Sequence, residues 1–355
     1  MPALMEPSTY YSNKAYDPRR IPNQVDASVR GTLHKLIGTR LPWGNAQEVV
    51  PSSLFQDPTP ETLRFWEKWE LEKNEMKASG TYTPRPLEDV ELHIKHDHEV
   101  FRHAQLPFRS QFWLFLKSAG KWATIILIPV LILAHITVMS ASEQSAWDFT
   151  THLFISFYSW ALGLPLICWM IGHIVITRFP TIWFRPPQGP KWEFNRRTGV
   201  VRIFNYRNAA DKNEAVEFEA PFTEFDAYII TSPDRQGLAM NSLSLVHRYN
   251  GAGINFNDLI TPDNTTQQPC ALWDFLQNYM DVSRPIPDIP MFEASRHLDP
   301  VSVAHDKKNG RKPRYWIDMA DNVFKEKLAE LLVRIDAIDT FSRSNLMLNH
   351  VKYMD

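Results

Sequence analysis

The sequence predicts an α+β protein that is held at a membrane. We expect a two-helix transmembrane hairpin, a cytoplasmic antiparallel β domain (a small barrel or a bent sheet) capped by a helix, and peripheral helices. Three observations predict this class: two long apolar segments without formal charge, short alternating segments separated by turns over residues 191–257, and amphipathic patterns over residues 268–280 and 318–338. The mean hydropathy of -0.31 indicates that the rest of the chain is polar, so the anchor carries a soluble body.

The two apolar segments occupy residues 122–140 and 153–176. At 1.5 Å rise per residue they extend about 28 Å and about 36 Å, which suits a hydrocarbon core of about 30 Å. The alternative is a pair of buried core helices in a large soluble domain, which such long uncharged segments disfavour. From residue 108 an aromatic segment with a basic residue predicts an amphipathic helix that lies in the interface before the first span.

Several small or polar residues lie inside these spans. Ser156, Ser159 and Gly163 recur along one side of the second span, as do Ser159, Gly163 and Pro165 with a slight offset, and we expect them to seat the first helix. His135 and His173 are candidates for function because polar residues are costly in a membrane. Two helices alone cannot enclose a pore, so we expect no ion conduction unless the protein forms a homo-oligomer.

Charged residues around the spans predict their orientation. Basic residues precede the first span and follow the second, whereas residues 141–151 between them contain no Lys or Arg. By the positive-inside rule both termini are expected in the cytoplasm. Eight basic residues are candidates for contact with anionic headgroups: Arg109, Lys117, Lys121, Arg178, Arg185, Lys191, Arg196 and Arg197. For Arg196 the alternative is an exposed residue in a turn that follows Asn195.

The N-terminal region comprises residues 1–107. Its first 60 residues are rich in Pro, Tyr, Asn and Ser, a composition that predicts extended structure. A helix is predicted near residues 60–77, because Thr59 can cap it and Pro60 suits its first position. Phe65, Trp66 and Trp69 form an aromatic shoulder on this helix, which we expect to bind a protein partner. Residues 90–94 alternate like a strand.

The polar run at residues 93–99, which contains three histidines, was weighed as a metal site. It matches neither a helical H-E-x-x-H nor a paired Cys/His pattern, so solvated polar residues are the preferred interpretation. The chain also lacks a G-x-S-x-G motif, a P-loop and a G-x-G-x-x-G motif. We therefore expect no catalytic residue, no cofactor and no metal.

Residues 185–282 are predicted as the β-rich domain. Alternating segments flank an Asn-Arg-Arg-Thr-Gly turn at residues 195–199, which predicts a hairpin, and further strands are expected at residues 215–218, 227–231, 242–248 and 252–257. An apolar stripe over residues 268–280 predicts the helix that caps the sheet.

This region carries a family resemblance. Its most specific residues are Arg185, Pro186, Pro190, Phe194, Asn195, Arg196, Gly199 and Val200. With the preceding hairpin, about residues 125–280 resemble uncharacterised bacterial two-span inner-membrane proteins often encoded near type VI secretion and Rhs-type toxin genes. The segment also looks like the bacterial pleckstrin-homology-like arrangement. The resemblance implies a bacterial inner-membrane location and a role beside a toxin system, and it brings no chemistry.

Residues 283–355 are predicted as a Pro-punctuated linker, a basic solvated loop at residues 305–314, and a C-terminal amphipathic helix. Phe324, Leu328 and Leu331 lie on the apolar stripe of that helix and are candidates for partner binding. The helix is expected to dock on the N-terminal aromatic helix, to pair with a second copy, or to bind another protein.

The near balance of charge, 38 basic against 40 acidic residues, gives no reason to expect nucleic-acid binding. The favoured function is a membrane-anchored protein-binding module that acts as an immunity or accessory protein of a bacterial toxin-delivery system, with a toxin or secretion component as partner. The first alternative is a membrane-surface scaffold or sensor that binds anionic lipid. The second is a membrane-associated enzyme.

Overall fold

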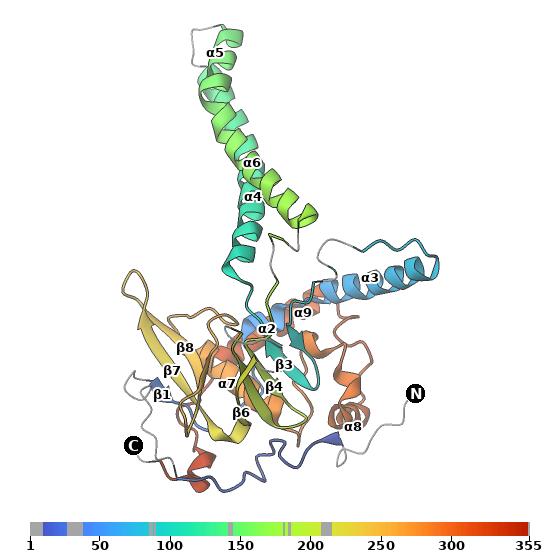
Figure 1. Ribbon diagram of the computed structural model, residues 1–355, viewed down its shortest axis with the longest axis vertical. Helices are drawn as coiled ribbons and strands as arrows, with labels where there is room; N and C mark the ends of the chain where they lie inside the picture. Colours follow the sequence, from blue (N-terminus) through green and yellow to red (C-terminus); the bar gives the residue numbers. More distant parts are fainter. Residues whose placement is uncertain are drawn as a thin grey trace. The chain divides into compact units, whose positions relative to one another are not determined.

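The computed structural model describes residues 10–26, 38–84, 88, 90–140, 145–179, 182–183, 186–206 and 215–353. The chain forms an α+β structure with two antiparallel sheets and two long apolar helices, which confirms the α+β part of the predicted class (Figure 1). Two compact units are present. The first contains Met1–Tyr82, His93–Ala104 and Gly189–Asp355, and the second contains Thr83–Leu92 and Gln105–Gln188.

The first unit contains a five-stranded antiparallel sheet in the order β2-β3-β4-β5-β6. Its strands are β2 Lys95–His96, β3 Val100–His103, β4 Trp192–Asn195, β5 Val200–Phe204 and β6 Val216–Pro221. Strands β4 and β5 form the predicted hairpin, with Asn195 opposite Val200. Gly199 is required in its turn, because its φ is 73° and an added Cβ would lie 2.2 Å from the Lys14 carbonyl oxygen.

A second, four-stranded antiparallel sheet has the order β1-β7-β8-β9. Its strands are β1 Gly38–Arg40, β7 Phe225–Pro233, β8 Ala239–His247 and β9 Gly253–Asn255, and the short helix η4 Phe222–Glu224 joins it to β6. Strands β6 to β9 lie where the alternating pattern predicts them. The β-rich part is therefore not one continuous barrel but two sheets, and β1, the first strand of the chain, pairs in the second of them.

Three strands, β1, β2 and β3, come from the N-terminal region, and none of them was predicted from the sequence. The predicted strand at residues 90–94 is absent, and the chain instead pairs residues 95–96 with 101–102. Asp97 explains this register, because its Oδ1 accepts the backbone N–H groups of Glu99 and Val100 at 2.9 and 2.7 Å and so closes the turn. The polar run at residues 93–99 is thus largely a hairpin turn.

Three histidines of the β2–β3 hairpin predict that the folded protein loses stability in acid. Burial and the nearby His103 lower the pKa of His96 to about 4, and burial also lowers the pKa of His98 and His103. A folded-state pKa below the unfolded value of about 6.5 means that the unfolded state takes up protons first as the pH falls. The contribution of the neutral histidines to the free energy of unfolding is therefore fully present above about pH 6.5 and is lost as the pH falls toward 4.

For His96 alone we expect a loss of about 2 kcal/mol in the free energy of unfolding between pH 7 and pH 5. Guanidinium unfolding of the wild type and of His96→Gln at several pH values measures it, since the variant should lack this part of the slope. Equal pH slopes for the two proteins would show that the His96 ring is not held neutral.

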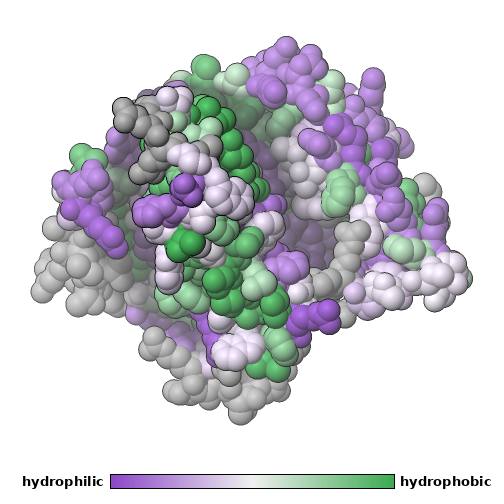
Figure 2. Space-filling model, turned by 90° about the horizontal axis from the view of Figure 1, so that it is seen from above, coloured by the Kyte–Doolittle hydropathy of each residue, from purple (hydrophilic) through white to green (hydrophobic). Residues whose placement is uncertain are grey.

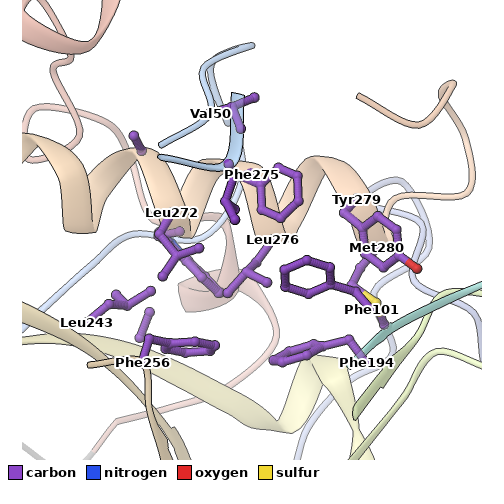
Figure 3. Close-up of a cluster of buried hydrophobic side chains, with 14 of the residues drawn as sticks. Val50, Phe101, Phe194, Leu243, Phe256, Leu272, Phe275, Leu276, Tyr279 and Met280 are labelled. Carbon is purple, nitrogen blue, oxygen red and sulfur yellow. The ribbon is translucent and has the colours of Figure 1, made fainter. Parts of the chain in front are cut away.

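Helix α7, Gln267–Met280, is the centre of the core. Figure 3 shows it lying across strands of both sheets, with Leu276 above Phe194 and Phe256. Phe101 of β3 packs against Phe275 and Tyr279 of the helix at ring distances of 5.3 and 5.7 Å. The helix therefore caps the sheets as predicted, and its apolar side chains join strands from both ends of the sequence.

The N-terminal region is part of this same core. Leu41 and Trp43 are fully buried, and three polar side chains of α7 hold the backbone beside them. Gln277 accepts the Gly44 N–H at 2.7 Å, Asp274 accepts the Gln47 N–H at 3.1 Å, and Asn278 donates to the Gln47 carbonyl at 2.7 Å. Residues expected to be extended are thus fixed by α7 and do not form a separate region.

The C-terminal residues also belong to the first unit, which differs from the predicted boundary at residue 282. Of the basic segment predicted as a loop at residues 305–314, residues 305–309 form the end of helix α8, Pro300–Asn309, and residues 310–314 lie beyond it. Asp299 caps that helix by accepting the Ser302 N–H at 2.9 Å, and Gly310 ends it at a φ of 64°. Helix α9, Asp321–Asp336, lies where the apolar stripe predicts it.

The second unit is a helical hairpin. Helix α4 spans Phe108–Ser140, so the predicted entry helix and first span are continuous, and α5 Ala146–Leu153, η2 Phe154–Tyr158 and α6 Ser159–Arg178 form the return arm. Both arms are long and apolar enough to cross a membrane. Figure 2 shows hydrophobic side chains exposed along the hairpin, where a soluble protein would normally carry polar ones.

The two arms pack through glycines that the sequence did not single out. Cβ atoms added to Gly120 of α4 and Gly172 of α6 would lie 2.5 Å from the Trp169 nitrogen and 2.7 Å from the Lys117 nitrogen. The predicted seat is right only at Pro165, whose carbonyl oxygen would lie 2.7 Å from a Cβ on Gly120. Ser156 and Ser159 are exposed, and Gly163 has no atom within 4 Å of such a Cβ. Close backbone approach needs the smallest residue directly at the crossing.

A polar link joins the arms near the loop. The Nδ1 atom of His135 lies 3.0 Å from the Tyr158 hydroxyl, and its Nε2 atom lies 3.3 Å from the Thr150 hydroxyl. Tyr158 ends the π-helical turn η2, whose extra residue re-aims the side chains that follow. His135 therefore has partners on the facing arm, which satisfy a polar ring in an apolar setting.

Strands β3 and β4 are neighbours in the sheet, although the whole hairpin lies between them in the chain. His103, at the end of β3, pairs with Trp192, at the start of β4. Residues 104–191 are therefore an insertion into a two-stranded antiparallel unit. This explains why the first unit draws on three separate segments of the sequence.

Candidate functional site

Helix α3, Pro60–Ala78, carries the aromatic shoulder that the sequence points to. The Thr59 hydroxyl accepts the Thr62 N–H at 3.2 Å and Pro60 occupies the first turn, as predicted. The first turns of α3 pack against the rest of the first unit. Leu63 is buried, and Arg64 donates to the Ile317 and Met319 carbonyls at 3.1 and 3.0 Å. The helix is therefore held at its N-terminal end and runs outward from there (Figure 1).

Two aromatic side chains on α3 remain in solvent. Phe65 is 58% exposed and Trp66 is 50% exposed, while Trp69 is half-buried. We call Phe65 and Trp66 the aromatic face of α3. Large aromatic side chains have a high cost of exposure, and they are enriched at protein interfaces. Of the six residues expected to bind a partner, these two are the ones most available to do so.

The three candidates on α9 are not available. Phe324 and Leu331 are buried, and Leu328 packs against the core. Phe324 stacks on Phe55 of α2, Ser52–Gln56, at a ring distance of 5.5 Å. The expectation that they bind a partner is therefore wrong, because the apolar stripe of α9 is covered by α2, α7 and α3 of the same chain.

Most of the basic residues of the helical hairpin that were predicted to contact headgroups are exposed. Arg109, Lys121 and Arg178 are exposed, and Lys117 is half-buried. The Arg109 guanidinium lies 4.9 Å from the centre of the Trp183 ring, a cation–π pair of two residue types typical of membrane interfaces. Arg185 lies outside the described residues.

Lys191 and Arg197 of the first unit are exposed but paired with acidic residues. Lys191 contacts the Asp258 carboxylate, and Arg197 lies 3.3 Å from the Glu99 carboxylate while also donating to the Tyr10 carbonyl at 2.9 Å. Each charge is therefore largely balanced by its partner, which weakens its attraction for anionic headgroups.

Arg196 is not at the surface, so both its interpretation as a headgroup contact and the exposed-turn alternative are wrong. Its side chain is fully buried and lies 3.6 Å from the buried Asp299 carboxylate. It donates to the carbonyls of Tyr279, Asp281 (2.8 Å) and Arg284 (2.7 Å) at the end of α7. This guanidinium ties the β4–β5 turn to the chain that leaves the central helix.

A signal for this burial was present in the sequence. Residues 192, 194 and 196 lie at alternate positions along β4 and its continuation and so share one face. Trp192 and Phe194 on that face are buried. Alternation therefore assigns Arg196 to the inner face and Arg197 to solvent. Its charge alone led to the opposite assignment.

Other charged groups inside the first unit are paired in ways that serve structure. Arg248 forms a two-bond contact with Asp226 at 2.8 and 3.1 Å, and Arg343 lies 2.9 Å from Asp274. Burial raises the pKa of Asp274, against the effect of Arg343 and the Gln47 N–H. In the part of the chain that the structure describes, no group of three or more His, Cys, Asp or Glu residues is arranged to hold a metal ion.

Comparison with protein families, with curated proteins and with solved structures found no match to this chain.

Proposed function

We propose that the protein is a membrane-anchored protein-binding module whose aromatic face on α3 docks a partner protein. The proposed location is the bacterial inner membrane, as the family resemblance implies. The distribution of basic residues around the spans supports a cytoplasmic position for both termini. The family resemblance adds the proposed role of an immunity or accessory protein in a type VI toxin-delivery system, and it makes the partner a toxin or a secretion component.

The observation that carries this proposal is the contrast between α3 and α9. Both helices carry large apolar side chains, but Phe324 and Leu331 of α9 are covered by the chain itself, whereas Phe65 and Trp66 of α3 remain half-exposed or more. Two exposed apolar arms provide the membrane attachment. The scaffold alternative has less support, since Arg196 is buried and Lys191 and Arg197 are paired.

The test is neutralisation of toxins encoded beside the gene. Each toxin is co-expressed with the full chain and growth is measured, with purified proteins used in parallel to measure direct binding. We expect the wild type to restore growth and the Phe65→Ser/Trp66→Ser variant to lose at least tenfold in affinity, since removing a central aromatic residue from an interface costs about 2 kcal/mol or more.

The matched control is Val333→Ser on α9, a side chain that is 68% exposed and lies outside the aromatic face of α3. It should bind and protect like the wild type. Binding without protection would indicate the accessory role. Equal affinity of the double variant and the wild type would remove the aromatic face from the proposal, and no binding to any neighbouring toxin would contradict the immunity role.

A further inference from the structure

A cavity of about 400 Å³ lies within the first unit, between α2, α8, α9 and the segment at residues 284–289. Its volume falls within the range of about 300–1,000 Å³ that is typical of small-ligand sites. Val50, Ile286 and Leu331 supply an apolar floor of buried side chains. Pro285 and Pro287 stiffen one wall, because proline fixes the backbone φ. The floor therefore suits an apolar group and is held in shape before any ligand arrives.

The deeper charges of the cavity are already neutralised. Arg296 forms a two-bond contact with Asp306 at 2.7 and 2.8 Å and donates to the Ile286 carbonyl. Arg311 makes the same kind of contact with Asp288 at 2.9 and 2.8 Å, and it also lies 2.6 Å from Glu293. The positive charges of Arg296 and Arg311 are thus already balanced by carboxylates, so these residues do not attract an anionic ligand.

The guanidinium groups of Arg284 and Arg334 line another part of the cavity and differ from this pattern. Arg334 donates to the Glu48 carbonyl at 3.1 Å, and Arg284 donates to the Asn278 side-chain oxygen at 2.8 Å. The carboxylates nearest to Arg284, those of Glu48 and Asp281, lie 3.8 Å away, beyond hydrogen-bonding distance. Both guanidinium groups converge on Glu48. Among the described residues, Arg284 forms only long ion pairs, with Glu48 and Asp281, and no ion pair is found for Arg334.

We propose that this cavity binds a small monocarboxylate with an apolar tail, a ligand site separate from the aromatic face of α3. The tail lies on Val50, Ile286 and Leu331, and the carboxylate accepts from the forked donors of Arg284 and Arg334, whose planar geometry matches it. The Glu48 carboxylate, whose side chain is 81% exposed, swings into solvent as the ligand takes its place beside Arg284. Glu48 thus competes with the ligand.

The probes are 4-phenylbutyrate, 4-phenylbutanol and 4-phenylbutylamine, which share a tail and differ in the head group. Each is titrated by calorimetry into the full chain in neutral-detergent micelles at pH 7.5. We expect the carboxylate to bind at least tenfold more tightly than the alcohol, and the amine to show no binding. Titration into empty micelles corrects for partition into detergent.

Four variants locate the site. Arg334→Gln and Arg284→Gln should each weaken 4-phenylbutyrate by about tenfold or more, because each removes a charged donor. Glu48→Gln should strengthen it severalfold by removing the competing anion. Arg235→Gln, at an exposed arginine in the turn between β7 and β8, is the matched control and should leave the affinity unchanged. Val50→Trp should fill the floor and abolish binding.

The folded state of Val50→Trp is checked by near-ultraviolet circular dichroism. Should that variant not fold, the exposed Arg334→Gln variant decides the matter. Failure of 4-phenylbutyrate to bind, equal binding of the acid and the alcohol, or unchanged affinity of both arginine variants would each overturn the proposal. Loss of toxin binding in Phe65→Ser/Trp66→Ser does not affect these titrations, so the two proposals fail independently.

Discussion

Replacing Arg196 by methionine is expected to lower the free energy of unfolding by about 3–5 kcal/mol, the cost of removing one partner from a buried ion pair. Methionine keeps much of the side-chain length but donates no hydrogen bond. The carbonyls of Tyr279, Asp281 and Arg284 then lose a donor, and Asp299 becomes a buried carboxylate without its cation. Guanidinium unfolding of the full chain in neutral detergent, followed by tryptophan fluorescence, measures the loss.

The neighbouring Arg197→Met is the matched control. Its side chain is 46% exposed and its ion pair with Glu99 is at the surface, so it should cost about 0–1 kcal/mol. Adding Asp299→Asn to Arg196→Met should restore part of the stability, because it removes the unpaired charge. Similar losses for Arg196→Met and Arg197→Met would contradict a central role for Arg196.

Leucine at Gly120 and Gly172 is expected to separate the two arms of the hairpin. A Cβ at either position would lie 2.7 Å or less from a backbone nitrogen on the facing helix, a distance that forces the backbones apart. The cost is about 1–3 kcal/mol at each site for an overpacked contact. It outweighs the gain of about 1 kcal/mol in helix propensity from replacing glycine.

The separation is measured by pulsed electron resonance between spin labels at Ile132 and Leu164, both exposed, in a variant without Cys168 and Cys270. The double leucine variant should give a longer and broader distance distribution than its parent. Gly163→Leu is the control, since nothing lies within 4 Å of its added Cβ and its distribution should not change. An unchanged distribution in the double variant would mean that α4 and α6 do not meet at these glycines.

Much of the secondary structure of the first unit follows from periodicity. Alternation predicts β4 to β9, and apolar stripes predict α7 and α9, because each of these elements buries one face. Strands β1, β2 and β3 were not predicted. β1 and β3 pair with β7 and β4, which lie far away in the chain, and β2 has only two residues. For the same reason the Pro-rich N-terminal region gave no sign that Leu41 and Trp43 are core residues.

The candidate site could be predicted only in part. The aromatic shoulder on α3 is visible in the sequence, but whether a stripe is covered by its own chain depends on tertiary packing. Phe65 and Phe324 are both aromatic residues on predicted helices, yet Phe65 is exposed and Phe324 lies in the core. Arg196 shows a different difficulty. Its charge predicts an exposed side chain, whereas the alternation along β4 predicts a buried one, and the alternation is right.

The insertion of the hairpin between β3 and β4 sets an order for biogenesis. Strand β3 leaves the ribosome before the first apolar arm and cannot pair with β4 until the second arm and the connector have been made. The pairing of His103 with Trp192 is thus a late contact between distant residues, which is slow to form. Completion of the five-stranded sheet therefore follows synthesis of both arms. Until then the N-terminal residues lack the strand β4 with which β3 pairs.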